Sequence, residues 1–155
     1  MMKKHIYIGI LFLLFVSCDI DKISDCFQST GSIITTEIEV EPFTKLRFEN
    51  DISLVLKQDS IQKVVIETGE NLLSNIKVIV EDGVLIIQDK NSCNLAGEYG
   101  VTKAYVSVPN LTEIRNSSSR EITSNGVLNF PNLKLVETDA AKRNKFCFLL
   151  SFPAK

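Results

Sequence analysis

The side chains with the clearest chemical potential are carboxylates at alternate positions. Glu37, Glu39 and Glu41 are spaced two residues apart, and in an extended strand such residues point to the same side. A strip of this kind could bind Ca²⁺ or supply the acid and base of glycoside chemistry. Ile38 and Val40 occupy the intervening positions, which suits a buried opposite face. We therefore interpret the strip as the solvated face of a strand, and we assign no catalytic residue and no metal ligand to it.

Histidine content restricts the remaining chemistry. His5 is the only histidine, and it lies in a segment that we expect to be removed. Without histidine, neither a Ser/His/Asp nor a Cys/His nucleophilic set can form, and histidine-containing zinc sites are excluded. No glycine-rich phosphate loop or nucleophile elbow occurs. The sequence predicts no enzyme and no cofactor.

The first 17 residues have the organisation of a secretory signal. Two lysines precede the uncharged, largely apolar segment 6–16, and Ser17-Cys18 follows. The apolar segment is shorter than the roughly 20 residues of a membrane-spanning helix. Phe15-Val16-Ser17-Cys18 resembles the lipobox of bacterial lipoproteins, with Phe15 where Leu is usual. We predict that residues 1–17 are a lipoprotein signal peptide; the alternative is an ordinary secretory signal with a chance cysteine.

On this prediction Cys18 is the lipid attachment site and the first residue of the mature chain. Two or three acyl chains, such as palmitate, hold a protein stably on a bilayer. We therefore expect a lipoprotein anchored in the outer membrane of the cell envelope, facing the periplasm or exposed at the surface. Residues 18–31 are polar and suit a tether between the lipid and a folded domain.

Three further cysteines lie in a compartment where thiols oxidise. We predict a disulfide between Cys26 and Cys93, which would close a loop of roughly 70 residues and contribute about 4 kcal/mol on the chain-entropy model. The alternative is two unpaired buried thiols. The spacing is not that of a zinc site, because no C-x-x-C pair occurs.

From Ile33 onward, apolar residues alternate with polar ones, which is typical of β-strands. Asp82-Gly83 lies between two alternating runs and predicts a two-residue hairpin turn. Only Asn71-Leu72-Leu73-Ser74 suggests a helical turn. The sequence therefore predicts an all-β domain.

A short motif recurs in the second half of the chain. Pro109-Asn110-Leu111 is repeated 22 residues later as Pro131-Asn132-Leu133, and each copy precedes a strand-like stretch. Between the copies lies the polar segment 116–120, which we interpret as a corner or turn. A repeat of this length is typical of a β-solenoid coil. We predict a right-handed β-solenoid or β-helix-like fold with an N-terminal hairpin-rich part, and the alternative is a β-sandwich.

The last 14 residues differ in character from the rest. Residues 142–155 contain four basic and no acidic side chains, and an apolar run at 146–152 has no turn residues around it. A solenoid needs a polar cap on its last coil. We hypothesise that the reading frame changes near residue 141, so that 142–155 is an atypical tail on a fragment. The alternative is a genuine last strand that packs on the core.

Charge disfavours a nucleic-acid partner. Residues 18–141 carry 11 lysine and arginine side chains against 19 aspartate and glutamate side chains. An acidic chain without a basic face cannot displace the counterions of phosphate groups.

Taken in order, several segments of residues 25–139 resemble the auto-transporter adhesin head GIN domain family. The segments that carry the resemblance are Asp25-Cys26-Phe27, Phe43-Thr44-Lys45-Leu46, Asp51-Ile52-Ser53-Leu54, Glu67-Thr68-Gly69-Glu70-Asn71, Asp82-Gly83-Val84-Leu85, Asn91-Ser92-Cys93-Asn94, Val106-Ser107-Val108-Pro109 and Ile114-Arg115-Asn116-Ser117-Ser118.

The resemblance implies a mostly β, right-handed solenoid-like domain that continues past residue 155, so that residues 32–141 would be a partial head GIN domain. It implies no catalytic residues. Many relatives have Gly after the serine pair, whereas this chain has Ser119-Arg120, so we expect a less tight corner here.

These observations favour a non-enzymatic envelope lipoprotein with a structural or adhesive role. Its partners would be the membrane, through the lipid, and an envelope glycan or protein. The alternative is a carbohydrate-active enzyme or carbohydrate-binding module that uses surface carboxylates. A periplasmic sensor or assembly subunit is a third hypothesis.

Overall fold

The computed structural model describes residues 29–91, 100–138 and 146–150, the last range as backbone alone. Cys18, Cys26 and Cys93 lie outside these ranges, so the predicted lipid attachment and disulfide stay predictions. In the described ranges, no helix is long and apolar enough to cross a membrane.

Strands make up nearly all of the regular structure, as the alternating pattern predicts. They are β1 (Ile33–Ile38), β2 (Lys45–Asn50), β3 (Ser53–Gln58), β4 (Lys63–Gly69), β5 (Ile76–Glu81), β6 (Val84–Asp89), β7 (Lys103–Val108), β8 (Glu113–Ser118), β9 (Ile122–Leu128), β10 (Lys134–Glu137) and β11 (Phe146–Leu150). The predicted helical turn is the 3₁₀ turn η2 (Leu73–Asn75). The all-β prediction is confirmed.

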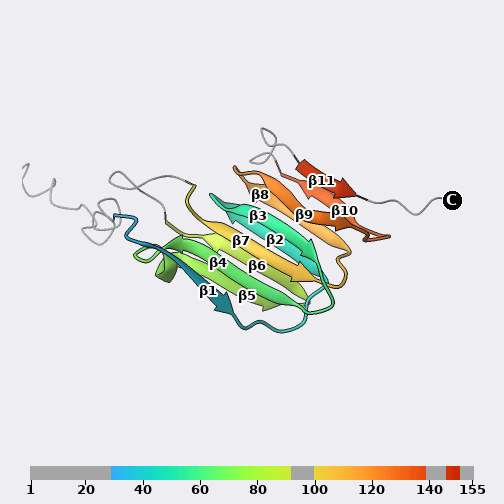
Figure 1. Ribbon diagram of the computed structural model, residues 1–155, viewed down its shortest axis with the longest axis horizontal. Helices are drawn as coiled ribbons and strands as arrows, with labels where there is room; N and C mark the ends of the chain where they lie inside the picture. The colour runs from blue at the N-terminus through green and yellow to red at the C-terminus, as the bar shows by residue number, and fades with distance from the viewer. Residues whose placement is uncertain (1–28, 92–99, 139–145, 151–155) are drawn as a thin grey trace, which may run out of the picture.

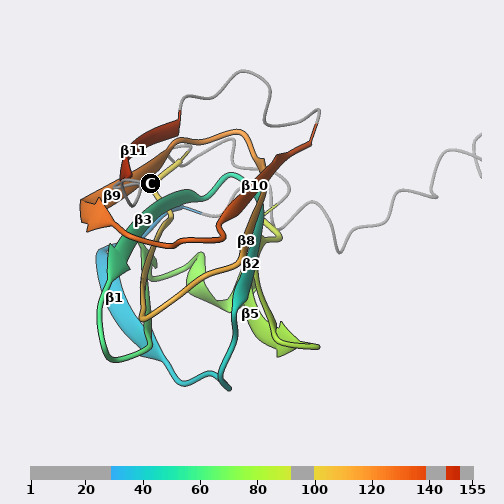
Figure 2. The same cartoon turned by 90° about the vertical axis from the view of Figure 1, so that its right-hand side faces the viewer.

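The strands form two mixed sheets (Figure 1). Sheet A has the order β1-β4-β7-β3-β9-β11, and sheet B has the order β10-β8-β2-β6-β5. Figure 2 shows the two sheets from the side, with β1, β3, β9 and β11 in one layer and β2, β5, β8 and β10 in the other. Two packed layers occur in the sandwich alternative, whereas the many parallel pairs of neighbouring strands are typical of a solenoid.

Consecutive strands repeatedly pass from sheet B to sheet A. β2 is followed by β3, β6 by β7, β8 by β9, and β10 by β11. In sheet B, β2 pairs in parallel with β6 and β8, and β8 pairs in parallel with β10. In sheet A, β3 pairs in parallel with β7 and β9. Side chains from residues far apart in the sequence therefore line up in rows across each sheet.

The antiparallel part of the structure comes from the N-terminal half. β4 lies between β1 and β7 and is antiparallel to both, and β5 and β6 form a hairpin. Asp82 and Gly83 have φ values of 50° and 72°, as the two central residues of a type I′ turn require. The predicted hairpin is confirmed.

The inner faces of the two sheets enclose one apolar core. Phe48 of β2 and Ile114 of β8 face it from sheet B, and Leu54 of β3 and Ile122 of β9 face it from sheet A. Burying a side chain of this size contributes about 1.5–3 kcal/mol. The core depends on strict alternation, because a shift by one residue would turn every apolar side chain outward.

The Pro-Asn-Leu repeat precedes two neighbouring strands, β8 and β10. Lys134 of β10 is aligned with Glu113 of β8, and the Lys134 N–H donates to the Thr112 carbonyl at 2.9 Å. Thr112 N–H in turn donates to the Thr44 carbonyl at 2.9 Å. The two copies therefore begin strands that lie side by side in parallel.

The interpretation of residues 116–120 as a corner is wrong for the first three of them. Asn116, Ser117 and Ser118 belong to β8, and the turn into β9 begins at Ser119. Asn116 and Ser118 are buried in the inward phase of the strand. Their side chains bond backbone groups nearby, as in the bond from Ser118 N–H to Asn116 Oδ1 at 2.9 Å, so a polar sequence can occupy an inner position.

The segment that we expected to be atypical contains a strand. β11 pairs in parallel with β9, with an irregularity in register between Cys147 and Leu149. Residues 139–145 and 151–155 lie outside the described ranges. The change of reading frame stays a prediction, which the nucleotide sequence around codon 141 tests.

Candidate functional site

The outer face of sheet B carries a row of cationic side chains. Leu46 and Phe48 of β2 point into the core, so Lys45, Arg47 and Glu49 point outward. In β8 the outward positions are taken by Glu113 and Arg115, among others. The register of the β2–β8 pair aligns Lys45 with Glu113 and Arg47 with Arg115.

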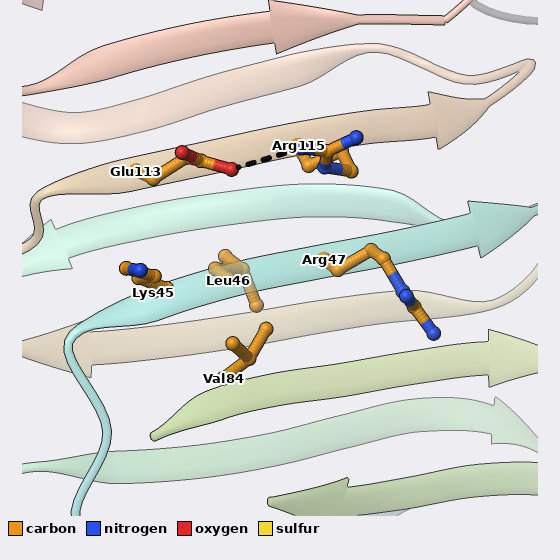
Figure 3. A pocket seen from close by; sticks show the side chains of 6 residues that line it. All are labelled: Lys45, Leu46, Arg47, Val84, Glu113 and Arg115. Atoms are coloured by element: carbon orange, nitrogen blue, oxygen red, sulfur yellow. Dashed lines mark hydrogen bonds and ion pairs between the residues drawn. The ribbon is translucent and has the colours of Figure 1, made fainter. Parts of the chain in front are cut away.

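A pocket of about 230 Å³ lies on this face (Figure 3). The residues that line it are Lys45, Leu46, Arg47, Val84, Glu113 and Arg115. They come from β2, β6 and β8, which are neighbours in sheet B. The pocket therefore exists because three parallel strands from distant parts of the sequence share one register.

Each arginine has one carboxylate nearby, on its own strand. Arg115 Nη2 donates to Glu113 Oε1 at 3.2 Å. Arg47 Nε lies 2.9 Å from Glu49 Oε1 as an ion pair, but this buried N–H is not aligned for a hydrogen bond. Glu113 precedes Arg115 on β8, whereas Glu49 follows Arg47 on β2. The two carboxylates therefore lie on opposite sides of the arginine pair along the strands. Glu113 is the one carboxylate among the residues that line the pocket.

Each carboxylate near the pocket has a second partner besides its arginine. Glu113 Oε2 also lies 3.7 Å from Lys134 Nζ, and Glu49 Oε2 accepts a hydrogen bond from Gln88 Nε2 at 3.0 Å. Lys45 has no ion pair within the described part of the chain. Positive charge on this face is thus only partly neutralised.

On the outer face of sheet A, in contrast, the lysines are paired with carboxylates. The ion pairs there are Lys63–Glu37 at 2.6 Å, Lys103–Glu67 at 3.0 Å and, at the end of β3, Lys57–Asp59 at 2.6 Å. Each of these lysines has a carboxylate of its own. This face is therefore charged but close to neutral.

Tyr105 belongs to the outer face of sheet A. Its side chain is half-buried, and its hydroxyl donates to Glu67 Oε2 at 3.2 Å. Burial raises the pKa of the Tyr105 phenol, and Glu67 raises it further. The hydrogen bond of the same Glu67 raises the pKa of Lys103.

The acidic strip found in the sequence is solvated, as interpreted, although only Glu37 lies in β1, which ends at Ile38. Glu37, Glu39 and Glu41 are exposed, whereas Ile38 and Val40 pack against the core. Across the described ranges, no three metal-binding side chains of the histidine, cysteine and carboxylate type gather in one place.

A second polar cluster ties two turns together. Asp51, in the turn between β2 and β3, accepts a hydrogen bond from Arg120 Nη2 at 3.0 Å and another from Ser119 Oγ at 3.1 Å. Burial opposes ionisation of Asp51, but Arg120 and Ser119 outweigh it and lower the pKa of this carboxyl. Ser119 and Arg120, where relatives were expected to have Gly, thus serve to bind Asp51.

The pocket was missed by sequence reasoning. Arg47 and Arg115 were not singled out, because 68 positions separate them and no local pattern connects the two strands. The signal available in the sequence was side-chain direction, because both arginines occupy polar, outward positions of an alternating run. The pocket is lined by three cations and one carboxylate, a local excess of positive charge that the net charge of residues 18–141 does not indicate.

Comparison with known proteins places this fold in a family. The family described as "Putative auto-transporter adhesin, head GIN domain" matches residues 42–143. A search of curated proteins finds no match.

Solved structures share the fold. A putative adhesin from Parabacteroides merdae is 21% identical with a TM-score of 0.60, covering 70% of this chain and 45% of that one. A putative adhesin from Bacteroides fragilis is 20% identical with a TM-score of 0.57, covering 68% and 51%. A putative lipid binding protein from Parabacteroides distasonis is 19% identical with a TM-score of 0.57, covering 70% and 47%.

The chain spans about half the length of these solved structures. The family match covers more than half of the chain and includes both sheets from β2 through β10. The chain therefore belongs to the auto-transporter adhesin head GIN domain family.

Proposed function

We propose that this protein is a non-enzymatic adhesion module of the cell envelope, anchored by lipid at Cys18. The observation that carries the proposal is membership of the adhesin head GIN family over residues 42–143. Relatives with the same fold are titled putative adhesins. The lipobox-like segment before Cys18 supplies the means of attachment.

We further propose that the domain is a β-solenoid with right-handed coils. Supporting this are the four pairs of strands that pass from sheet B to sheet A, and their parallel stacking with aligned rows. Stacked coils produce broad, flat faces on which outward side chains repeat at the strand spacing of about 4.8 Å. Such a face suits binding to an extended polymer or to another surface.

The enzymatic alternative lacks a supporting observation. Glycoside hydrolysis uses two carboxyl groups on either side of the scissile bond. Glu113 is the one carboxylate among the residues that line the sheet B pocket. Glu37 belongs to β1, Glu39 and Glu41 follow its end, and all three are exposed.

Adhesion is tested with whole cells. The full-length chain is expressed in a bacterial host that lacks it, and cell retention is measured on surfaces coated with glycans, envelope polymers or matrix proteins. We expect retention on at least one coating, together with recovery of the protein in the membrane fraction and labelling by radioactive palmitate.

Cys18→Ser is the matched variant. It should abolish palmitate labelling and move the protein out of the membrane fraction, and cells should no longer be retained. Retention equal to that of cells without the gene, on every coating, would refute the adhesive role. Unchanged palmitate labelling of Cys18→Ser would refute the anchor.

A further inference from the structure

The register of sheet B places two arginines side by side. Arg47 and Arg115 are aligned partners in the parallel pair β2–β8, and both point outward. Neighbouring strands lie about 4.8 Å apart, and like charges directly opposite each other are destabilising. In Figure 3 the two side chains come from adjacent strands beside the pocket, and that of Arg47 runs toward β6. An anion bound in the pocket, which both arginines line, would relieve this repulsion.

Hydrogen-bond donors remain available at this position. A guanidinium group has five N–H donors, and Arg115 uses Nη2 to contact Glu113. Arg47 Nε is buried beside Glu49, whereas the Arg47 side chain as a whole is 41% exposed. The planar fork of Arg matches the two oxygens of a carboxylate or sulfate group. The donors and the geometry therefore fit an oxyanion.

The charge is local to this pocket. Lys45 has no ion pair among the described residues, and Glu113 is shared between Arg115 and Lys134. By contrast, Lys63 and Lys103 on sheet A each have a carboxylate partner of their own. In a chain that is acidic over residues 18–141, an excess of cations at one pocket would select anionic groups there.

The size of the pocket limits what fits. At about 230 Å³ it is below the usual range of about 300–1,000 Å³ for a drug-sized ligand. It can hold one charged group with part of a sugar ring, and Val84 supplies an apolar contact. One such contact binds weakly. A polymer with repeated charges, engaged by many anchored copies, would gain affinity through avidity.

We propose that the pocket formed by Lys45, Arg47, Val84, Glu113 and Arg115 binds the carboxylate or sulfate groups of acidic polysaccharides. This inference rests on the proposed adhesive function and specifies its ligand class. Arg47 and Arg115 hold the anionic group, Lys45 adds long-range attraction, and Glu113 keeps Arg115 in place.

The test uses the full-length lipidated chain in proteoliposomes of neutral lipid. Binding is measured to immobilised polygalacturonate, dextran sulfate and uncharged dextran. Arg47→Gln/Arg115→Gln removes the paired arginines, and Lys57→Gln/Lys63→Gln removes two cations from the sheet A side as the matched control. Thermal unfolding establishes that all variants are folded.

We expect the arginine variant to bind either acidic polymer about 10-fold or more weakly, as for loss of a charge-assisted hydrogen bond. The lysine control should change binding less than about 2-fold, as expected for surface charges away from the site. Binding by the wild type should fall as salt is raised. Arg47→Lys/Arg115→Lys should restore part of the affinity, because charge returns without the fork.

Several results would overturn the inference. Equal losses in the arginine and lysine variants would show that binding follows net charge rather than the pocket. Equal binding to uncharged dextran would refute the ligand class. Competition by anionic phospholipid vesicles as strong as by the polymers, at matched charge, would assign the site to a membrane surface.

Different results would refute the proposed adhesive function and the pocket inference. If cells carrying Arg47→Gln/Arg115→Gln adhere as strongly as wild-type cells, the pocket inference falls while adhesion stands. If wild-type cells adhere to no coating, adhesion falls, and polymer binding by proteoliposomes then decides the pocket independently.

Discussion

The hydroxyl of Ser118 is the most testable structural contact in the protein. This side chain is fully buried on β8, and its Oγ donates to the Ile52 carbonyl at 2.8 Å. It also lies 3.2 Å from the Ile52 N–H and 3.0 Å from the Arg120 N–H, both of which donate to it. One hydroxyl thus connects the β2–β3 turn to the β8–β9 turn.

Ser118→Ala removes this connection without creating a large cavity. A buried polar group left without its partner costs about 1–3 kcal/mol. Because Ile52 is itself fully buried, water cannot easily replace the hydroxyl at both of its backbone groups. We therefore expect a loss of about 2–6 kcal/mol in the free energy of unfolding, on the basis of two such groups.

The assay is equilibrium urea unfolding of the purified chain, followed by circular dichroism, with thermal unfolding alongside it. For a chain of this size, each 1 kcal/mol lowers the Tm by about 2–4 °C. Ser117→Ala is the control, because Ser117 occupies the adjacent, outward position and should change stability by less than about 0.5 kcal/mol. Equal effects of the two substitutions, or a Ser118→Ala chain as stable as wild type, would refute the reasoning.

Three further predictions concern other positions. Gly100→Ala should destabilise the protein by about 1–3 kcal/mol, since Gly100 has a φ of 76° and an added Cβ would collide with the Arg120 guanidinium; a double-mutant cycle with Arg120→Ala should show non-additive unfolding free energies. Gly83→Ala should cost about 1–2 kcal/mol from its positive φ alone, because nothing lies within 4 Å of the added atom, and an unchanged urea midpoint would contradict this. Burial raises the pKa of Asp89 above 3.8, so the folded state holds this proton more tightly than the unfolded state, and stability should fall as pH rises from about 3.8 through the raised pKa. Asp89→Asn should remove that part of the fall, and urea midpoints measured from pH 3.5 to 7 for both chains check it.

Local features of the sequence account for much of the fold. The period-two pattern predicted strands, and Asp82-Gly83 predicted the hairpin because few residue pairs adopt positive φ at both central positions of a turn. The acidic strip was correctly interpreted as solvated, since Ile38 and Val40 mark the buried side. These successes share a cause: side-chain direction along a strand depends only on nearest neighbours.

The same dependence on neighbouring residues explains why the buried polar residues of β8 were wrongly interpreted as a corner. Asn116 and Ser118 interrupt the apolar alternation of β8, so the sequence favoured a corner there. Ser118 is retained inside because Ile52, 66 residues away, supplies backbone partners for its hydroxyl. No pattern within β8 indicates that such partners exist.

The sequence by itself determined the strands, their inward and outward faces, the hairpin and the family resemblance, because each depends on neighbouring residues or on ordered segments. Tertiary structure alone decided that Arg47 lies beside Arg115 and that Asp51 binds Arg120. Both contacts require parallel strands distant in sequence to share one register, which is set by the packing of whole sheets around the core. The basic pocket is a product of that register.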